Sequence, residues 1–384
     1  MGRAPRRNGP RRSKSWRRLH TVVHGCLAGR QAEALEELCW ARIWDTSTGF
    51  PAQRHGAYGM EVSALWAFFD SPWDCLASGL GPKGAYLRDR VGLDLFALGR
   101  LPEAIKVLRA ALDDNQDNEE RTNRAVIAGH LAQALQASGD LAGALKFAKD
   151  AVALVESGRN SLDHVNWHIV RKTTLGDILH QMGRTVDAKK EFEEAERLQT
   201  QLLYSHQGFW YCDLLLDLGE VDEVLRRATR TLKKAKEDST SRDEFLDQVS
   251  LGRAHLLVAQ RGGGGDLAEA SGHLDDAVEG LRNFHGQDYL PFSLLARAAL
   301  RTFKRDLAGA LDDLEQACAL AVRCGFRLHE ADAHLGYART FMAQGIAASA
   351  VPHIVRAKEL IKTTGYRRRL QPLTDLEAEL QQRA

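Results

Sequence analysis

The stretch SGDLAGALKFAKDAV at residues 138–152 contains the pattern that decides the fold. Its second residue, Gly139, suits the left-handed turn that ends one helix and lets another begin at once. Ala144, Ala148 and Ala151 follow 5, 9 and 12 positions after that glycine. These spacings place all three alanines on one face of the second helix, where small side chains allow close packing. The stretch therefore predicts two tightly packed helices joined by a short turn.

Similar phrases recur along the chain. The turn positions are Gly29, Gly99, Gly139, Gly183, Gly219, Gly265, Arg305 and Gly345. Five positions after the turn, every copy has alanine except the fifth, which has valine. Consecutive turns lie 70, 40, 44, 36, 46, 40 and 40 residues apart, so the first interval has room for an irregular extra unit. Periods of this length are typical of proteins built from stacked helical repeats.

The first helix of most copies shows a second regularity, a large residue followed by a small one before the turn. Examples are Leu131–Ala132 and Leu175–Gly176. From about residue 85 to 360 the two regularities together resemble the tetratricopeptide motif. The resemblance implies an all-α, right-handed α-solenoid of about eight helical hairpins with a C-terminal capping helix. Helical bundles and HEAT-like solenoids are the alternatives, and eight turns in register favour the tetratricopeptide arrangement.

We expect four segments along the chain. They are a basic disordered tail (1–18), an irregular helical region (19–83) with an extra helix near 54–69, a solenoid (84–363) and a capping helix (364–384). The tail holds eight basic residues and no acidic one, and Gly2, Pro5, Gly9 and Pro10 argue against a helix there. The remaining 366 residues hold 44 basic and 51 acidic side chains. An acidic body argues against a nucleic-acid track along the solenoid, so we expect nucleic-acid contact only through the tail.

Motifs for catalysis are missing from the sequence. It has no phosphate-binding G-x-x-x-x-G-K-[ST] loop, no G-x-S-x-G elbow and no dinucleotide-binding G-x-G-x-x-G phrase. His164 and His168 lie one helical turn apart but lack a third ligand for zinc. The six cysteines have unrelated spacings, and no segment reads as a secretory signal or a membrane span. We therefore expect a cytoplasmic protein that is not an enzyme and binds no cofactor, metal, nucleotide or membrane.

Several phrases resemble a narrower family. They are HGCLAGRQAEALEELCWARI (24–43), FFDSPWD (68–74), GLDLFALGRLPEA (92–104), LYSHQGFWYCDLLLDLG (203–219) and LLARAAL (294–300). These resemble the C-terminal repeat arm of large bacterial signalling NTPases of the NACHT or STAND type. That resemblance implies a sensor or regulatory arm, stand-alone or part of a longer protein. The nearest phrase to a phosphate-binding loop, GLGPKG at 79–84, lacks its spacing and hydroxyl.

Polar residues on the first helices of the central units are the candidate binding residues. In tetratricopeptide arrays these helices line the concave groove, which selects residues about 2, 3, 6, 10 and 13 positions before the turn. The candidates are Gln133, Gln136, Arg171, Asp177, His180, Gln207, Trp210, Asp213 and Arg339. The leading hypothesis is a scaffold that binds a protein or peptide in this groove. The alternative is a nucleic-acid-linked regulator whose tail and Arg367, Arg368 and Arg369 contact phosphate.

Overall fold

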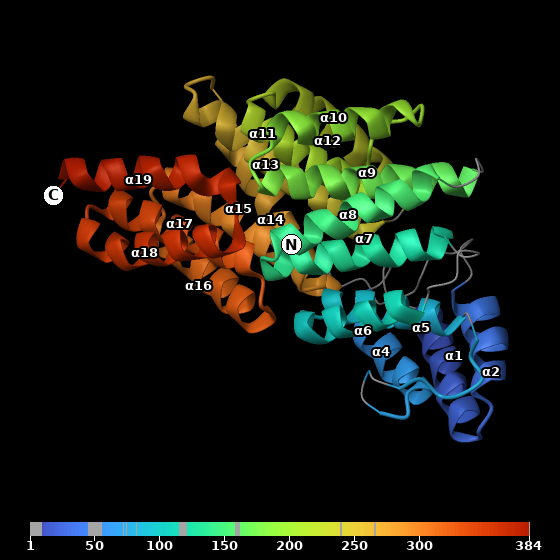
Figure 1. Cartoon of the computed structure of the whole chain (residues 1–384). Coiled ribbons are helices and arrows are strands. Elements are labelled where there is room, and N and C mark those ends of the chain that lie inside the picture. Colours follow the sequence, from blue (N-terminus) through green and yellow to red (C-terminus); the bar gives the residue numbers. More distant parts are fainter. Residues whose placement is uncertain are drawn as a thin grey trace.

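The computed structural model describes residues 10–44, 56–71, 73, 75–81, 83–114, 121–157, 162–238, 240–264 and 266–383. Helices make up most of these residues (Figure 1). The described part of the chain contains no strand, only an isolated bridge between Phe69 and Leu76. The all-α class is therefore confirmed. None of the helices in the described ranges is both long and apolar enough to cross a membrane.

The N-terminal region forms a small helical unit. It contains α1 (Pro10–Leu27), α2 (Gln31–Glu33), the π-helix η1 (Ala34–Ile43), α4 (Tyr58–Leu65) and the 3₁₀ helix η2 (Trp66–Phe68). Two predictions are corrected here. The extra helix is shorter than the expected 54–69, and α1 begins inside the segment expected to be disordered. Pro10 is the first residue of α1, a position where the missing N–H costs no helical hydrogen bond.

Seven helix pairs follow. They are α5 (Lys83–Ala97) with α6 (Leu101–Asp114), α7 (Arg121–Ser138) with α8 (Leu141–Glu156), α9 (Leu162–Gln181) with α10 (Thr185–Arg197), α11 (Ser205–Leu218) with α12 (Val221–Asp238), α13 (Ser241–Gln260) with α14 (Leu267–Phe284), α15 (Leu290–Phe303) with α16 (Leu307–Cys324), and α17 (Arg327–Gln344) with α18 (Ala347–Thr364). The 3₁₀ turn η4 (Arg367–Arg369) and helix α19 (Leu370–Arg383) end the chain. This arrangement is the predicted stack of helical hairpins.

The predicted turns coincide with left-handed backbone. Seven of the eight turn positions have positive φ, among them +86° at Gly139 and +66° at the non-glycine Arg305. The eighth, Gly265, lies outside the described residues. The residue five positions after each turn is buried in all eight units. Seven of these side chains are completely inaccessible, and the eighth, Ala34, is 3% exposed. The repeat register read from the sequence is confirmed.

The stack curves until its late units meet its early ones. Figure 1 shows the orange and red C-terminal helices beside the green middle of the chain. The backbone N–H of Gln287 donates to the carbonyl of Ala97 at 2.7 Å. The turn at Gly139 lies against Thr364 and Arg327, so close that a Cβ added there would be 2.5 Å from a Thr364 methyl carbon. The first helices of the pairs therefore face a central hollow, and contacts between early and late units close this hollow.

Candidate functional site

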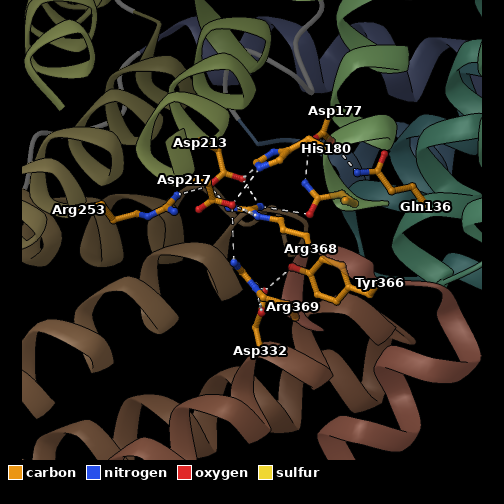
Figure 2. Close-up of polar contacts among 11 residues, drawn as sticks. Gln136, Asp177, His180, Asp213, Asp217, Arg253, Asp332, Tyr366, Arg368 and Arg369 are labelled. Carbon is orange, nitrogen blue, oxygen red and sulfur yellow. Dashed lines mark hydrogen bonds and ion pairs between the residues drawn. The ribbon is translucent and has the colours of Figure 1, made fainter. Parts of the chain in front are cut away.

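Asp213 and Asp217 on α11 are the centre of a polar network inside this hollow (Figure 2). They stand four residues apart, so both carboxylates lie on one side of the helix. Arg368 of η4 reaches them from the far end of the chain. Its Nη1 and Nη2 donate to the two oxygens of Asp213 at 2.5 and 2.8 Å, and its Nε donates to Asp217 at 2.5 Å. Every nitrogen of this guanidinium thus has a carboxylate partner, the strongest arrangement for an arginine.

Two further arginines complete the network. Nε of Arg369 donates to Asp332 of α17 at 2.6 Å, and the hydroxyl of Tyr366 donates to the other oxygen of Asp332 at 2.9 Å. Nη1 of Arg253 on α13 lies 2.6 Å from Asp213. Three arginines therefore neutralise three aspartates. The network joins α11, α13 and α17 to the C-terminal turn, and so holds the solenoid closed.

Amide groups extend the network toward α7. The side chain of Gln181 accepts from Nη1 of Arg368 at 3.2 Å and donates to Asp177 at 2.8 Å. Gln136 donates to the second oxygen of Asp177 at 2.6 Å. Among the described residues, this carboxylate accepts hydrogen bonds from these two amides alone, and burial raises its pKa to about 6. An unbroken chain of contacts therefore crosses the hollow from α7 to η4.

The pKa shifts in the network distinguish its charged residues, Asp213 and Arg368, from the neutral His180. Burial opposes ionisation of Asp213, but Arg368 and Arg253 outweigh it and hold the pKa of that carboxyl well below its usual range. The pKa of Arg368 is raised in turn, because Asp213 and Asp217 outweigh its burial. Burial and the nearby Arg368 lower the pKa of His180, so this imidazole is neutral near pH 7. Its Nε2 lies 3.0 Å from Asp217.

A cavity of about 580 Å³ opens beside the network, between α11, α13, α15 and α17. One wall carries the ion pairs described above, and the other is apolar, with Leu256, Phe292 and Leu295. Phe303 at this cavity is 41% exposed, an apolar side chain without a full cover. A volume in this range is typical of ligand pockets, which span roughly 300–1,000 Å³. No three His, Cys, Asp or Glu side chains in the described part of the chain form a group suited to a metal ion.

Arg339 on α17 differs from the other charged residues of the cavity in its lack of a partner among the described residues. Its side chain is exposed to the cavity, and within the described ranges it takes part in no ion pair or hydrogen bond. Two carboxylates, Asp332 and Asp375, act on its charge. Asp332 is paired with Arg369, whereas Asp375 accepts a hydrogen bond from the neutral amide of Gln371 and does not line the cavity. Burial and the charge of Arg369 lower the pKa of Arg339. A guanidinium placed in this way is ready for an anionic group from outside the chain.

The nine residues predicted to line the groove fall into three places. Asp213 and Arg339 line the large cavity. Gln133, Gln136, Asp177 and Trp210 line a smaller cavity of about 80 Å³, and His180 is completely buried beside Asp213 and Asp217. Gln207 is half-buried and lines neither cavity, and Arg171 lies elsewhere. The positions selected by the repeat register thus include seven residues around the network and two outside it.

Arg171 is a correction, because it does not face solvent as expected. Its side chain is completely buried, and Nη1 donates to the carbonyl of Val126 at 3.1 Å. Arg171 stands 12 residues before Gly183, whereas Asp332 of the network stands 13 residues before Gly345. One residue rotates a helix by about 100°, so Arg171 points into the contact of α9 with α7. Its replacement would disturb folding and could not test the groove.

Arg368 and Arg369 correct the alternative reading of the C-terminal arginines. Both were expected to contact phosphate, but their guanidinium groups are engaged by Asp213, Asp217 and Asp332. Asp217 and Asp332 themselves were missed, although each stands at a register position expected to face the groove. The repeat register could not have identified Arg253, because this residue stands 12 positions before Gly265, which is not one of the positions expected to face the groove.

Comparisons with known proteins agree with this architecture. Residues 85–157, which span α5 to α8, match the model of the tetratricopeptide repeat. A Rap conjugation gene regulator of the plasmid pLS20, solved in complex with the Phr* peptide, is similar in structure, with a TM-score of 0.59 and 15% identity. The similarity covers 91% of this chain and 95% of that one. Yeast Tom70 aligns with a TM-score of 0.44 at 16% identity, over 97% of this chain and 83% of that one.

These similarities concern the fold. No match to the chain is found among curated protein sequences. The chain is therefore an all-α stack of helical hairpins with a tetratricopeptide-like fold, and the repeat model itself matches residues 85–157 within it. Because one fold can carry many functions, the function has to be argued from the hollow itself.

Proposed function

We propose that this protein is an interaction scaffold that binds a peptide, or an extended segment of a protein, in the large cavity of its hollow. The observation that carries the proposal is the cavity between α11, α13, α15 and α17, which combines apolar walls with charged side chains held in place by ion pairs. Such a combination suits a ligand that has both apolar side chains and polar backbone. The structurally similar Rap regulator was solved with a peptide, which supports the same kind of ligand by analogy of fold.

We further propose that the scaffold is the sensor or regulatory arm of a bacterial signalling or defence system. This part of the proposal rests on the phrases that resemble the repeat arms of NACHT or STAND NTPases. It also fits a closed solenoid, because a ligand in the hollow would lie against the helices and ion pairs that join early and late units, and could favour one arrangement of these units over another. No catalytic step is assigned to the chain, and association is the proposed activity.

The test is to block the cavity without touching the core. Ala299 on α15 lines the cavity and is exposed, so Ala299→Trp should obstruct the cavity and leave the helix packing unchanged. The matched control is Ala308→Trp, at an exposed alanine on α16 that lines neither cavity. Cross-linking mass spectrometry in a lysate of the source organism should capture one partner with the wild type and the control, and lose it with Ala299→Trp. Equal capture by all three proteins would refute the cavity as the binding site.

The basic tail supports the second candidate, a nucleic-acid-linked regulator. Because α1 begins at Pro10, the appropriate variant removes residues 2–9 and keeps the helix. If the tail contacts phosphate, the full chain should bind random DNA or RNA with an affinity that falls steeply with salt. The truncated chain lacks Arg3, Arg6 and Arg7, so it should bind more weakly and with a shallower salt dependence. Binding of the cavity partner should be unaffected by the truncation. Loss of that partner on truncation would favour the second candidate over the first.

A further inference from the structure

We infer that the ligand of the large cavity presents one carboxylate next to an apolar side chain, and that Arg339 binds this carboxylate. The inference rests on the proposed function and deepens it, because it names the chemistry of the peptide. Its starting point is the charge of the cavity wall. Four arginines line the cavity, namely Arg253, Arg339, Arg368 and Arg369, against only three aspartates.

The three aspartates are already neutralised by the chain. Asp213 pairs with Arg253 at 2.6 Å and with Arg368 at 2.5 Å. Asp217 receives Nε of Arg368, and Asp332 receives Nε of Arg369. Among the groups that line the cavity, the positive charge of Arg339 is the one left over, although the chain outside the tail is acidic. A ligand with a single negative charge would therefore make the cavity neutral.

From the surroundings of Arg339 we infer that its charge is compensated by a ligand. Arg339 lies on the cavity wall near a second arginine, Arg369, and the charge of that group opposes its own. Solvent in the cavity reaches the Arg339 side chain, so a carboxylate that enters can form the two parallel hydrogen bonds that guanidinium groups favour. A phosphate dianion would be a poorer match, because the wall offers one uncompensated charge and not two.

The apolar part of the ligand follows from the opposite wall. Phe292 and Leu295 are half-buried at the cavity, Ala299 is exposed there, and Phe303 is 41% exposed. These side chains lie on α15, and α17 with Arg339 is packed against that helix. A ligand that covers the apolar wall must therefore carry its anionic group within one helix-to-helix spacing, about 8–10 Å. An apolar residue next to a carboxylate in a short peptide satisfies this distance.

Two sources of the carboxylate are distinguishable, the C-terminus of a peptide and an acidic side chain. The experiment uses three pools of N-acetylated pentapeptides with Ala, Val, Leu and Phe at the varied positions. The first pool has a free C-terminal carboxylate, the second is amidated with one Asp at a varied position, and the third is amidated without any acid. Each pool is equilibrated with the full-length protein, and the retained peptides are quantified by mass spectrometry.

The wild type should retain the first or the second pool at least tenfold better than the third. Arg339→Gln should lower that retention to the level of the third pool, and Arg339→Lys should preserve part of it because the charge remains. Arg230→Gln, at an exposed arginine of α12 outside the cavity, is the matched control and should behave as the wild type. Circular dichroism should show unchanged unfolding for Arg339→Gln, since this side chain holds no neighbour in place.

The outcomes separate the two proposals. Equal retention of all three pools, or unchanged retention by Arg339→Gln, would overturn the role of Arg339. If Ala299→Trp nevertheless abolished retention, the cavity would remain the binding site. If the wild type retained no pool at all, the inferred ligand chemistry would be wrong, and the capture experiment with Ala299→Trp would judge the scaffold proposal independently.

Discussion

Single alanines determine how closely the helices of a pair approach. Ala144 and Ala310 are completely buried five positions after their turns. Ala144→Leu or Ala310→Leu adds three carbons at a contact without space, and should lower the free energy of unfolding by about 1–3 kcal/mol. Lys146→Ala, at an exposed position of α8, should change it by less than about 0.5 kcal/mol. Urea unfolding compares the three variants, and an equal effect of the alanine and lysine changes would mean that the register is misplaced.

Asp247 on α13 gives a residue-scale prediction about pH. Its side chain is 4% exposed, one oxygen accepts from the Thr231 hydroxyl at 2.8 Å, and the other has no partner within the described residues. Burial raises the pKa of Asp247 to about 8. Between about pH 4 and 8 the folded protein therefore keeps a proton that the unfolded chain has released. Folding stability falls as pH rises through this window, because the native state binds more protons there.

Asp247→Asn should remove this contribution. The amide oxygen can still accept from Thr231, but the side chain no longer titrates. The melting temperature of the wild type should decrease from pH 5 to pH 8 more steeply than that of the variant. Scanning calorimetry across that range measures both slopes under the same conditions, so all other titrating groups cancel in the comparison. Parallel slopes would show that Asp247 is ionised in the native protein.

At the scale of elements, the short turn η4 has more influence than its three residues suggest. Arg368 is 3% exposed and connects η4 to α11 across 155 residues of sequence. Arg368→Ala would break the pair with Asp213, in which both side chains are 3% exposed, and removal of one partner of a buried pair costs about 3–5 kcal/mol. Lys358→Ala is the control, since its pair with Glu377 is 63% exposed on the lysine side and should contribute less than about 1 kcal/mol. Denaturant unfolding measures both, and a cost for Arg368→Ala as small as the control would argue against η4 as the element that closes the solenoid.

At the scale of the whole molecule, a comparison of two glycine turns distinguishes the effect of backbone strain from the effect of losing the contact between early and late units. Gly139 and Gly345 have nearly the same left-handed φ, +86° and +81°. Alanine at either position therefore meets a similar backbone penalty of about 1–2 kcal/mol. Only at Gly139 would the new Cβ collide with a distant unit, at 2.5 Å from Thr364, while nothing lies within 4 Å at Gly345.

Gly139→Ala should consequently destabilise the protein more than Gly345→Ala. Small-angle scattering should also show a larger radius of gyration for Gly139→Ala, because early and late units are pushed apart. The Gly345 variant should keep the radius of the wild type. If both variants lost the same stability and kept the same radius, the contact between the turn at Gly139 and α18 would not be part of the solution structure.

The sequence alone determined the repeat, the turns and the buried stripe. Each of these depends on contacts within about 15 residues, such as Gly139 with Ala144 and Ala151, and short-range periodicity records them directly. It also singled out Asp213 and Arg339 as groove residues. It failed at Arg171, where a difference of one position rotates the side chain from the groove into a helix contact.

Only the tertiary structure decided which distant residues meet. The small rotation between neighbouring units adds up along the solenoid, so the position of η4 beside α11 depends on every unit between them. No local pattern predicts that Arg368 reaches Asp213, or that this pairing leaves Arg339 as the uncompensated charge of the cavity. The helical architecture could therefore be predicted from the spacing of small residues and turns. The ion pairs of the hollow could not, because they form only where the curvature of the solenoid brings distant units together.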